Sequence, residues 1–330
     1  MKLKPLEDQT IVITGGSSGI GLATARMAAR RGANVVIIAR NEEGLEEAAQ
    51  QIRAEGGRCD TISADVAKRE EVKNAVQTVI ERHGGFDTWV SNAGVGVYAK
   101  LEELSDEDHH QLFDINYWGV VHCATEALPH LRERGGALIT TGSISSQLPA
   151  PVLSAYTASK FAVKGYIDSL RLELIHDKAP VSVTLIQPSG ISTPFGEHAL
   201  NQMDERSQVP PPVYSPDIVA RTICRAAEYP MRDVMVGGGG RAMTLFATLL
   251  PNLADQVFAY SFFKTALNEN EPKRPEDGKG FYTGGGEGEV YGDQSMRHTS
   301  VYTTLRSHPI ASAVGLAVAA GTVGMALRQR

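Results

Sequence analysis

A tyrosine and a lysine on one side of a helix could exchange protons with an alcohol or a ketone. Tyr156 and Lys160 lie four residues apart in the run SAYTASK, and positions i and i+4 of a helix share a face. An ammonium beside a phenol favours the ionised phenol, so we expect Lys160 to lower the pKa of Tyr156 toward neutrality. Lowering the pKa of a tyrosine from its usual value near 10 to about neutrality corresponds to about 4 kcal/mol. Many solvated helix faces carry such a pair by chance, so the rest of the chain decides its meaning.

A glycine-rich turn near the N-terminus predicts a site for a pyrophosphate. The turn follows the β-branched run 10–14 and leads into a helix-like stretch at 22–31. Backbone N–H groups and the helix dipole attract phosphate oxygens there, and glycines allow them to come close. An apolar run at 33–39 completes a βαβ unit, which disfavours the alternative of a flexible loop. The predicted cofactor-binding residues of this turn are Gly15, Ser17, Ser18, Gly19, Ile20 and Gly21.

The end of the second predicted strand indicates which dinucleotide binds. An acidic residue about 20 positions after the glycines would hold the ribose 2′-hydroxyl of NAD. Ala39 stands there instead, and Arg40 follows it. A guanidinium without a neighbouring carboxylate suits a 2′-phosphate, so the sequence favours NADP over NAD. The alternative is that Arg40 is an exposed residue that simply ends the strand.

The chain from about residue 5 to 240 resembles the classical short-chain dehydrogenase/reductase family in several ordered motifs. The segment 14–21 matches the family's Thr-Gly-x-x-x-Gly-x-Gly, and 92–94 matches its Asn-Ala-Gly turn. Asp65 and Val66 stand where the family contacts the adenine ring. The resemblance implies a Rossmann fold and a nicotinamide cofactor.

The resemblance also implies roles for four catalytic side chains. Tyr156 would be the general acid for carbonyl reduction, or the base for alcohol oxidation, and Lys160 would bind the nicotinamide ribose. Ser143 would hold the substrate oxygen, and Asn116 would position a water that relays protons toward Lys160. The nicotinamide supplies the hydride. The further residues implied in cofactor binding are Arg40, Asp65, Val66, Asn92, Ala93, Gly94, Tyr156, Lys160, Pro188, Ile191 and Thr193.

One position departs from the family pattern. Behind the sixth predicted strand, family members have Pro-Gly-x-Ile/Val-x-Thr, which touches the nicotinamide carboxamide. The corresponding run here is PSGIST, with Ser189 in place of the first glycine. We expect cofactor binding to be retained because Pro188, Ile191 and Thr193 match. We expect the local backbone and the shape of the substrate pocket to differ.

Composition excludes several other classes of function. The chain has 330 residues, 42% of them hydrophobic, and a net charge of −6, which gives no support for nucleic-acid binding. Three cysteines lie far apart without metal-ligand spacing, so we expect neither disulfides nor a metal site. We also expect a cytoplasmic location, where cysteines stay reduced. The pair His109-His110 follows an acidic run and predicts a solvated helix start rather than a metal site.

Alternating strand-like and helix-like runs predict an α/β fold, a doubly wound parallel sheet with helices on both faces. Ligands in such sheets bind beyond the C-terminal ends of the strands, where the motifs fall. The proline-bearing stretch 192–214 would form a lid that sets substrate specificity. The predicted strands are 11–14, 34–39, 59–64, 86–91, 137–142, 181–187 and 233–236.

The C-terminal third departs from the family plan. After a catalytic domain at 1–240, residues 241–267 predict an apolar helical extension that packs on the enzyme, on another subunit or on a membrane. Residues 268–300, rich in charge, proline and glycine, predict a disordered linker. The segment 301–330 contains 18 uncharged residues, 310–327, which would span about 27 Å as a helix. This segment predicts a transmembrane helix or a helix docked on another subunit.

These features together predict an NADP(H)-dependent oxidoreductase for a carbonyl or secondary alcohol. A lipophilic substrate would suit a membrane-tethered enzyme, and the family resemblance suggests a homo-oligomer. A sugar derivative or an acyl thioester is an alternative substrate. The alternative from another class is a non-catalytic nicotinamide-binding sensor or membrane-associated scaffold.

Overall fold

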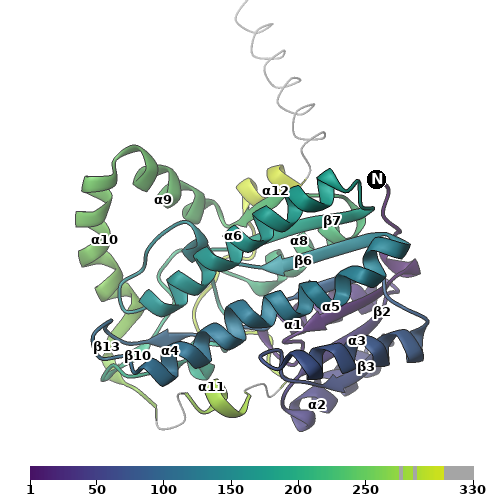
Figure 1. The fold of residues 1–330 in the computed structure, drawn as a ribbon. Coiled ribbons are helices and arrows are strands. Elements are labelled where there is room, and N and C mark those ends of the chain that lie inside the picture. The colour runs from purple at the N-terminus through teal and green to yellow at the C-terminus, as the bar shows by residue number, and fades with distance from the viewer. Residues whose placement is uncertain (275–277, 285–287, 308–330) are drawn as a thin grey trace, which may run out of the picture.

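A parallel sheet forms the centre of the molecule (Figure 1). The computed structural model describes residues 1–274, 278–284 and 288–307. Seven strands follow the order β12-β7-β6-β4-β1-β2-β3, and each neighbouring pair is parallel. The predicted α/β doubly wound fold is confirmed. The strands are β1 (Thr10–Thr14), β2 (Asn34–Ala39), β3 (Arg58–Ser63), β4 (Thr88–Ser91), β6 (Gly136–Thr141), β7 (Val181–Pro188) and β12 (Asp233–Val236).

Helices cover both faces of this sheet. One core contains Val76 of α3 and Val163 of α6, and the other contains Leu22 of α1 and Ile223 of α8. Because both faces are covered, a strand such as β2 is apolar along nearly its whole length rather than alternating. The helices are α1 (Gly19–Arg30), α2 (Glu42–Ala54), α3 (Arg69–His83), α4 (Asp106–Phe113), α5 (Gly119–Arg134), α6 (Ser154–His176) and α8 (Pro216–Glu228).

The predicted lid, residues 192–214, folds into short elements above the C-terminal edge of the sheet. Its α7 is followed by three very short strands, one of which pairs with β5 and one with β8. These pairings attach the segment to the loops that follow the central strands. The elements are β5 (Val97–Tyr98), β8 (Gly190–Ile191), α7 (Phe195–His198), β9 (Leu200–Asn201), β10 (Glu205–Ser207) and β11 (Val213–Tyr214).

Two helices, α9 (Gly238–Leu249) and α10 (Pro251–Ala266), extend from the sheet as an arm (Figure 1). The inner face of the arm packs Ala254 and Phe258 against Leu148. Its outer face exposes apolar side chains, including Leu249 and Tyr260. Helices therefore occupy the stretch in which the sequence predicts an apolar helical extension.

Within residues 268–300, for which the sequence predicts a disordered linker, the described residues include one strand and one short helix. Strand β13 (Leu267–Pro272) pairs antiparallel with β10, and α11 (Lys279–Thr283) follows. Farther on, Arg297 forms a bridge with Tyr214. The glycines that suggested flexibility instead supply left-handed turns, with φ of +91° at Gly278 and +85° at Gly284. Backbone hydrogen bonds to β10 and β11, together with the burial of Phe281 and Val290 in the two cores of the sheet, hold the described residues of this stretch.

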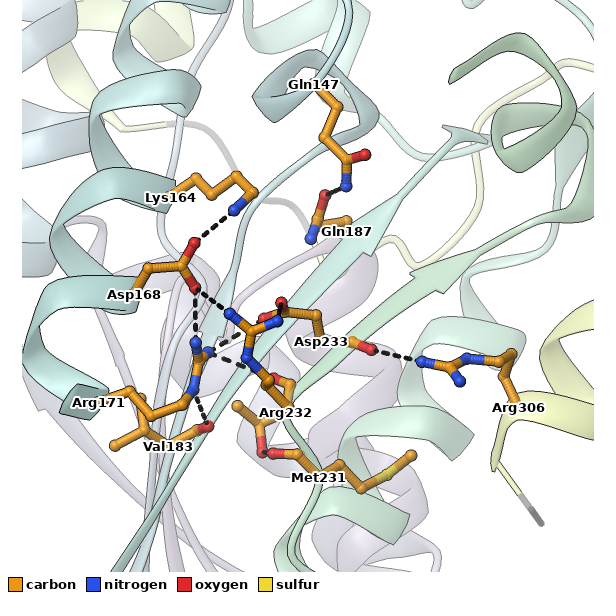
Figure 2. Close-up of polar contacts among 11 residues, drawn as sticks. Gln147, Lys164, Asp168, Arg171, Val183, Gln187, Met231, Arg232, Asp233 and Arg306 are labelled. Atoms are coloured by element: carbon orange, nitrogen blue, oxygen red, sulfur yellow. Dashed lines mark hydrogen bonds and ion pairs between the residues drawn. The ribbon is translucent and has the colours of Figure 1, made fainter. Parts of the chain in front are cut away.

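The last described helix, α12 (Val301–Ser307), packs beside β12. Arg306 donates to the Asp233 carbonyl oxygen at 3.5 Å, and the guanidinium of the buried Arg171 binds the Asp233 carboxylate at 3.0 Å. Figure 2 shows the two arginines on opposite sides of Asp233. The predicted membrane segment 310–327 lies outside the described residues. Among the helices that the structure describes, none has the length and apolar character needed to cross a membrane.

Candidate functional site

Tyr156 and Lys160 lie near the start of α6 and share one face of it. The Lys160 ammonium nitrogen is 5.6 Å from the centre of the Tyr156 ring. Lys160 is only 4% exposed, and its Nζ donates to the Thr141 carbonyl oxygen at 3.3 Å, which ties α6 to the end of β6. The i, i+4 spacing thus brings the phenol and the ammonium together at the sheet edge.

The electrostatics of this pair differ from the sequence-based expectation. Burial raises the pKa of Tyr156, and a hydrogen bond with Ser143 opposes that effect only in part. Burial also lowers the pKa of Lys160 to about 8. The expectation that Lys160 would bring the Tyr156 pKa to neutrality is therefore wrong for this arrangement. Burial is the largest influence on the Tyr156 pKa, which lies above its usual value, so the phenol is a proton donor at neutral pH.

Ser143 follows β6 and begins a short 3₁₀ turn, Ile144–Ser146. Its Oγ accepts from the Ser145 amide at 3.1 Å, and its own amide donates to the Ser146 Oγ at 3.3 Å. The first bond orients the Ser143 hydroxyl, and the second holds the backbone of the turn. Its remaining proton can be donated to an oxygen beside Tyr156.

Asn116 lies in a π-helical turn, Asp114–Trp118, between α4 and α5. Such turns are rare and often mark functional sites. The Asn116 amide exchanges two hydrogen bonds with the Val95 backbone, at 2.9 and 3.0 Å. A Cβ added at Gly94 would lie 3.2 Å from Asn116 Oδ1 and 3.5 Å from Lys160 Nζ. Glycine at this position leaves space between the amide and the ammonium.

The turn after β1 has the shape of a phosphate cradle. Gly15 has φ of +64°, and a Cβ on Gly21 would lie 1.9 Å from the Gly15 carbonyl oxygen. The Asn92 side chain donates to the Thr14 and Gly15 carbonyl oxygens at 3.2 Å each, which joins the loops after β1 and β4. Only glycine permits this tight approach, so these residues fit the pyrophosphate of a dinucleotide.

Arg40 directly follows β2 and is partly buried rather than exposed. Burial lowers its pKa, and the nearby Asp65 carboxylate opposes that effect. Its guanidinium donates to three carbonyl oxygens of α11: Gly280 at 3.0 Å, Phe281 at 3.4 Å and Tyr282 at 3.1 Å. No sequence motif indicated these partners, which lie more than two hundred residues away.

The departure at Ser189 is accommodated by glycines from the start of α9. The Ser189 hydroxyl donates to the Val236 carbonyl oxygen at 2.7 Å. A Cβ on Gly237 would lie 1.9 Å from Ser189 Oγ, and one on Gly240 would lie 2.9 Å from Ser189 Cβ. The run of four glycines at 237–240 was visible in the sequence, but only packing shows that it makes room for Ser189.

One cavity of about 290 Å³ brings most of the predicted residues together. Of the predicted site residues, Gly21 and Asn116 do not line it. The wall nearest Tyr156 is mainly apolar, and Phe195 packs edge-on against the Tyr156 ring with ring centres 5.5 Å apart. Motif reasoning missed several lining residues from the lid and the C-terminal segment, namely Phe195, His198, Val209, Met243, Phe262, Gly280 and Gly284.

Comparisons with known proteins identify the family of this chain. The short chain dehydrogenase family model matches residues 9–204. The chain is 40% identical over 335 residues to the oxidoreductase YxnA of Bacillus subtilis, covering 100% of this chain and 93% of that protein. It is 34% identical over 269 residues to an 11-beta-hydroxysteroid dehydrogenase of Pinus massoniana, covering 78% of this chain and 75% of the relative.

A solved structure agrees with both the sequence and the fold. An alcohol dehydrogenase of the archaeon Thermococcus sibiricus, complexed with 5-hydroxy-NADP, superposes with a TM-score of 0.61 at 29% identity. The match covers 69% of this chain and 95% of that one. With the family motifs on one cavity edge and a relative matched along the full chain, this protein belongs to the short-chain dehydrogenase/reductase family and is an NAD(P)-dependent oxidoreductase.

Proposed function

We propose that this enzyme is an NADP(H)-dependent reductase of lipophilic ketones, which also oxidises the corresponding secondary alcohols. The observation that carries the proposal is the position of Ser143, Tyr156 and Lys160 on one side of a cavity whose substrate wall is apolar. A protonated Tyr156 favours reduction at neutral pH, because the ketone oxygen must receive a proton.

The substrate end of the cavity supports a lipophilic molecule. Its wall comes from the loop after β6, the lid and the arm, and is built mainly of apolar side chains. A pocket of this kind binds through burial of apolar surface, while a few polar groups orient the reacting atom. The relative from Pinus massoniana is named as an 11-beta-hydroxysteroid dehydrogenase, and a steroid is a lipophilic molecule. The apolar lining residues include Ile144, Leu148, Leu153, Phe195, Val209, Met243 and Phe262.

Each polar residue has a distinct task in the reduction. Ser143 donates a hydrogen bond to the ketone oxygen, and this bond strengthens as negative charge develops. Tyr156 gives its phenolic proton to the same oxygen, and the Lys160 ammonium stabilises the phenolate that remains. Bound nicotinamide supplies the hydride. Asn116 holds the Val95 backbone, and Gly94 leaves space between Asn116 and Lys160 in which a water can relay the proton that restores Tyr156.

The preference for NADP rests on the end of β2. Ala39 stands at the position of the acid that would hold a free 2′-hydroxyl, and Arg40 lines the cavity beside it. Burial makes the Arg40 cation costly, and a 2′-phosphate would compensate that cost. We expect Arg40→Asp to weaken NADPH binding by at least 10-fold more than it weakens NADH binding, because loss of the carbonyl contacts of Arg40 affects both nucleotides and loss of a phosphate contact affects only NADPH.

Fluorescence titration of the purified protein with NADPH and NADH measures both affinities. Arg221→Asp, which makes the same charge change at an exposed position of α8, is the matched control and should leave the ratio of the affinities unchanged. Equal effects of Arg40→Asp on the two nucleotides would show that Arg40 does not read the 2′-phosphate.

Turnover is tested by following NADPH absorbance with a panel of ketones of increasing apolar size. We expect kcat/KM to rise with apolar surface and to fall at least 1,000-fold in Tyr156→Phe. Sugar-derived carbonyls and acyl thioesters form the comparison set. Turnover confined to that set would refute the lipophilic substrate, and nucleotide binding without any turnover would favour a sensor or scaffold.

The proposal includes a location and an assembly. The catalytic part works in the cytosol as a homo-oligomer, and the uncharged stretch 310–327, outside the described residues, tethers it to a membrane. The support for a tether is the length of this stretch without charge. Fractionation of cells that express the full chain is the test. Recovery without detergent in the supernatant after ultracentrifugation would refute the tether.

A further inference from the structure

We infer that residues 278–284 and 288–294, together called the strap, roof the adenosine end of the cofactor cavity and slow the release of the bound dinucleotide. This inference depends on the cofactor class of the family. It does not depend on the proposed substrate or on the preference for the 2′-phosphate.

The strap lines the same cavity as the cofactor residues. Gly280 and Gly284 share the cavity with Arg40 and Asp65, the residues assigned to the adenosine ribose and the adenine. A Cβ added at Gly284 would lie 3.3 Å from the Arg40 Cβ, so the strap backbone comes directly against the end of β2. Since glycines have no side chains, this wall leaves the cavity open beneath it.

The side chains that anchor the strap are turned away from the cavity. Phe281 is 0% exposed and belongs to the same hydrophobic core as Val66. The Tyr282 hydroxyl donates to the Asp108 carboxylate of α4, and α11 lies near α4 in Figure 1. Neither aromatic residue lines the cavity. A segment that blocked the cofactor site would fill the cavity with side chains. The strap instead crosses the cavity with the backbone of Gly280 and Gly284, so it covers the cavity and leaves its interior free.

The second half of the strap fastens the phosphate turn to the lid. The Gly19 amide, the first of α1, donates to the Glu289 carbonyl oxygen at 2.8 Å. The Ser192 hydroxyl donates to the Gln294 carbonyl oxygen at 2.9 Å. The Gln294 side-chain amide exchanges two hydrogen bonds with the Val209 backbone, at 2.8 and 3.1 Å. The strap therefore connects both ends of the cofactor cleft.

Arg40 couples the strap to the bound cofactor. Its guanidinium is the donor for three strap carbonyl oxygens and also lines the cavity. A ligand that contacts the closed form stabilises it relative to an open form, so cofactor and strap reinforce each other. Release of the dinucleotide requires these strap contacts to break first.

The first test measures dissociation rates in the full-length protein. Stopped-flow fluorescence follows the release of NADPH and of NADH from wild type, Phe281→Ala and Tyr282→Phe. We expect Phe281→Ala to speed the release of both nucleotides on the order of 10-fold, with a smaller increase in Tyr282→Phe. Tyr229→Phe removes a hydroxyl from an exposed tyrosine after α8 and should change neither rate.

The second test follows the strap itself by hydrogen–deuterium exchange. Saturating NADPH should slow exchange in strap peptides of the wild type. In Phe281→Ala this protection should be lost from the strap but kept in the phosphate turn, residues 15–21. Protection of the turn also shows that the variant is folded. Tyr282→Phe, a smaller change, should also reduce the protection of the strap by NADPH.

Two results would overturn the roof. Unchanged release rates in both strap variants would show that the strap does not retain the cofactor. Tighter binding in Phe281→Ala, together with faster strap exchange when NADPH is added, would show that the segment is a competitor that the cofactor displaces. Failure to reduce any ketone while these nucleotide results hold would refute the proposed function and leave the roof standing.

Discussion

At the scale of single residues, burial rather than charge proximity governs the acid–base pair. Lys160 is enclosed between α6 and the end of β6, and this desolvation brings its pKa to about 8. Tyr156 shares that environment and keeps its proton. The pair is therefore set for proton donation, with an ammonium that is charged below about pH 8 and neutral above it.

The pH dependence of ketone reduction follows from this arrangement. Below about pH 8 the Lys160 ammonium stabilises the phenolate left by Tyr156, so kcat should be on a plateau. As pH rises through that value the lysine loses its proton, and kcat should fall. Lys160→Arg keeps a cation to much higher pH, so the fall should move above about pH 10 even if the plateau is lower. Steady-state profiles of both proteins measure this shift, and superimposable profiles would contradict it.

A second residue-scale feature is the fit of Ser189 against the start of α9. Gly240→Ala should destabilise the fold by about 1–3 kcal/mol, because its Cβ would lie 2.9 Å from both Ser189 Cβ and Ile144 Cδ1. Ser189→Gly should restore part of that loss. The two changes should therefore couple by more than about 0.5 kcal/mol in urea unfolding.

The matched control for this cycle is Gly165→Ala. Gly165 is an exposed glycine of α6, and a Cβ there would meet nothing within 4 Å. It should stabilise the fold by about 0.5–1 kcal/mol, as alanine does in a helix. Strict additivity of the Gly240 and Ser189 changes would mean that the two sites do not share the space inferred from their distance.

At the scale of elements, the arm of α9 and α10 presents two different apolar faces. The inner face carries Met243 and Phe262 to the substrate cavity and packs Phe258 against Leu148. The outer face exposes a row of large apolar residues, including Phe263 at 44%. Only the inner face of the arm therefore lines the pocket. Adjacent residues of α10 differ in their surroundings, because Phe262 faces the cavity and Phe263 faces solvent.

This two-sided arm predicts a difference between adjacent phenylalanines. Phe262→Ala should raise KM for a lipophilic ketone by about 10-fold and change kcat much less, because it removes apolar contact with the bound substrate. Phe263→Ala makes the same truncation on the outer face and should leave both constants unchanged. Steady-state kinetics decide the matter, and equal effects of the two substitutions would argue against a substrate role for the inner face.

At the scale of the whole molecule, the C-terminal segment surrounds the functional edge of the sheet. The arm covers the substrate end, the strap covers the adenosine end, and α12 returns to β12. Composition alone predicted disorder for 268–300, because few of its residues form an apolar pattern. Phe281 and Val290 nevertheless reach buried positions in the two cores of the sheet. A segment without a core of its own can be ordered by the core that it joins.

The sequence by itself determined the parts that depend on neighbouring residues. The strand–glycine–helix unit at 10–31, the alternation of strands and helices, and the spacing of Tyr156 and Lys160 follow from local periodicity and backbone geometry. Only the tertiary structure decided the direction of the pKa changes, the contact of Ser189 with 237–240, and the partners of Arg40. Desolvation and long-range contacts depend on which segments pack together, and no local pattern in the chain encodes that.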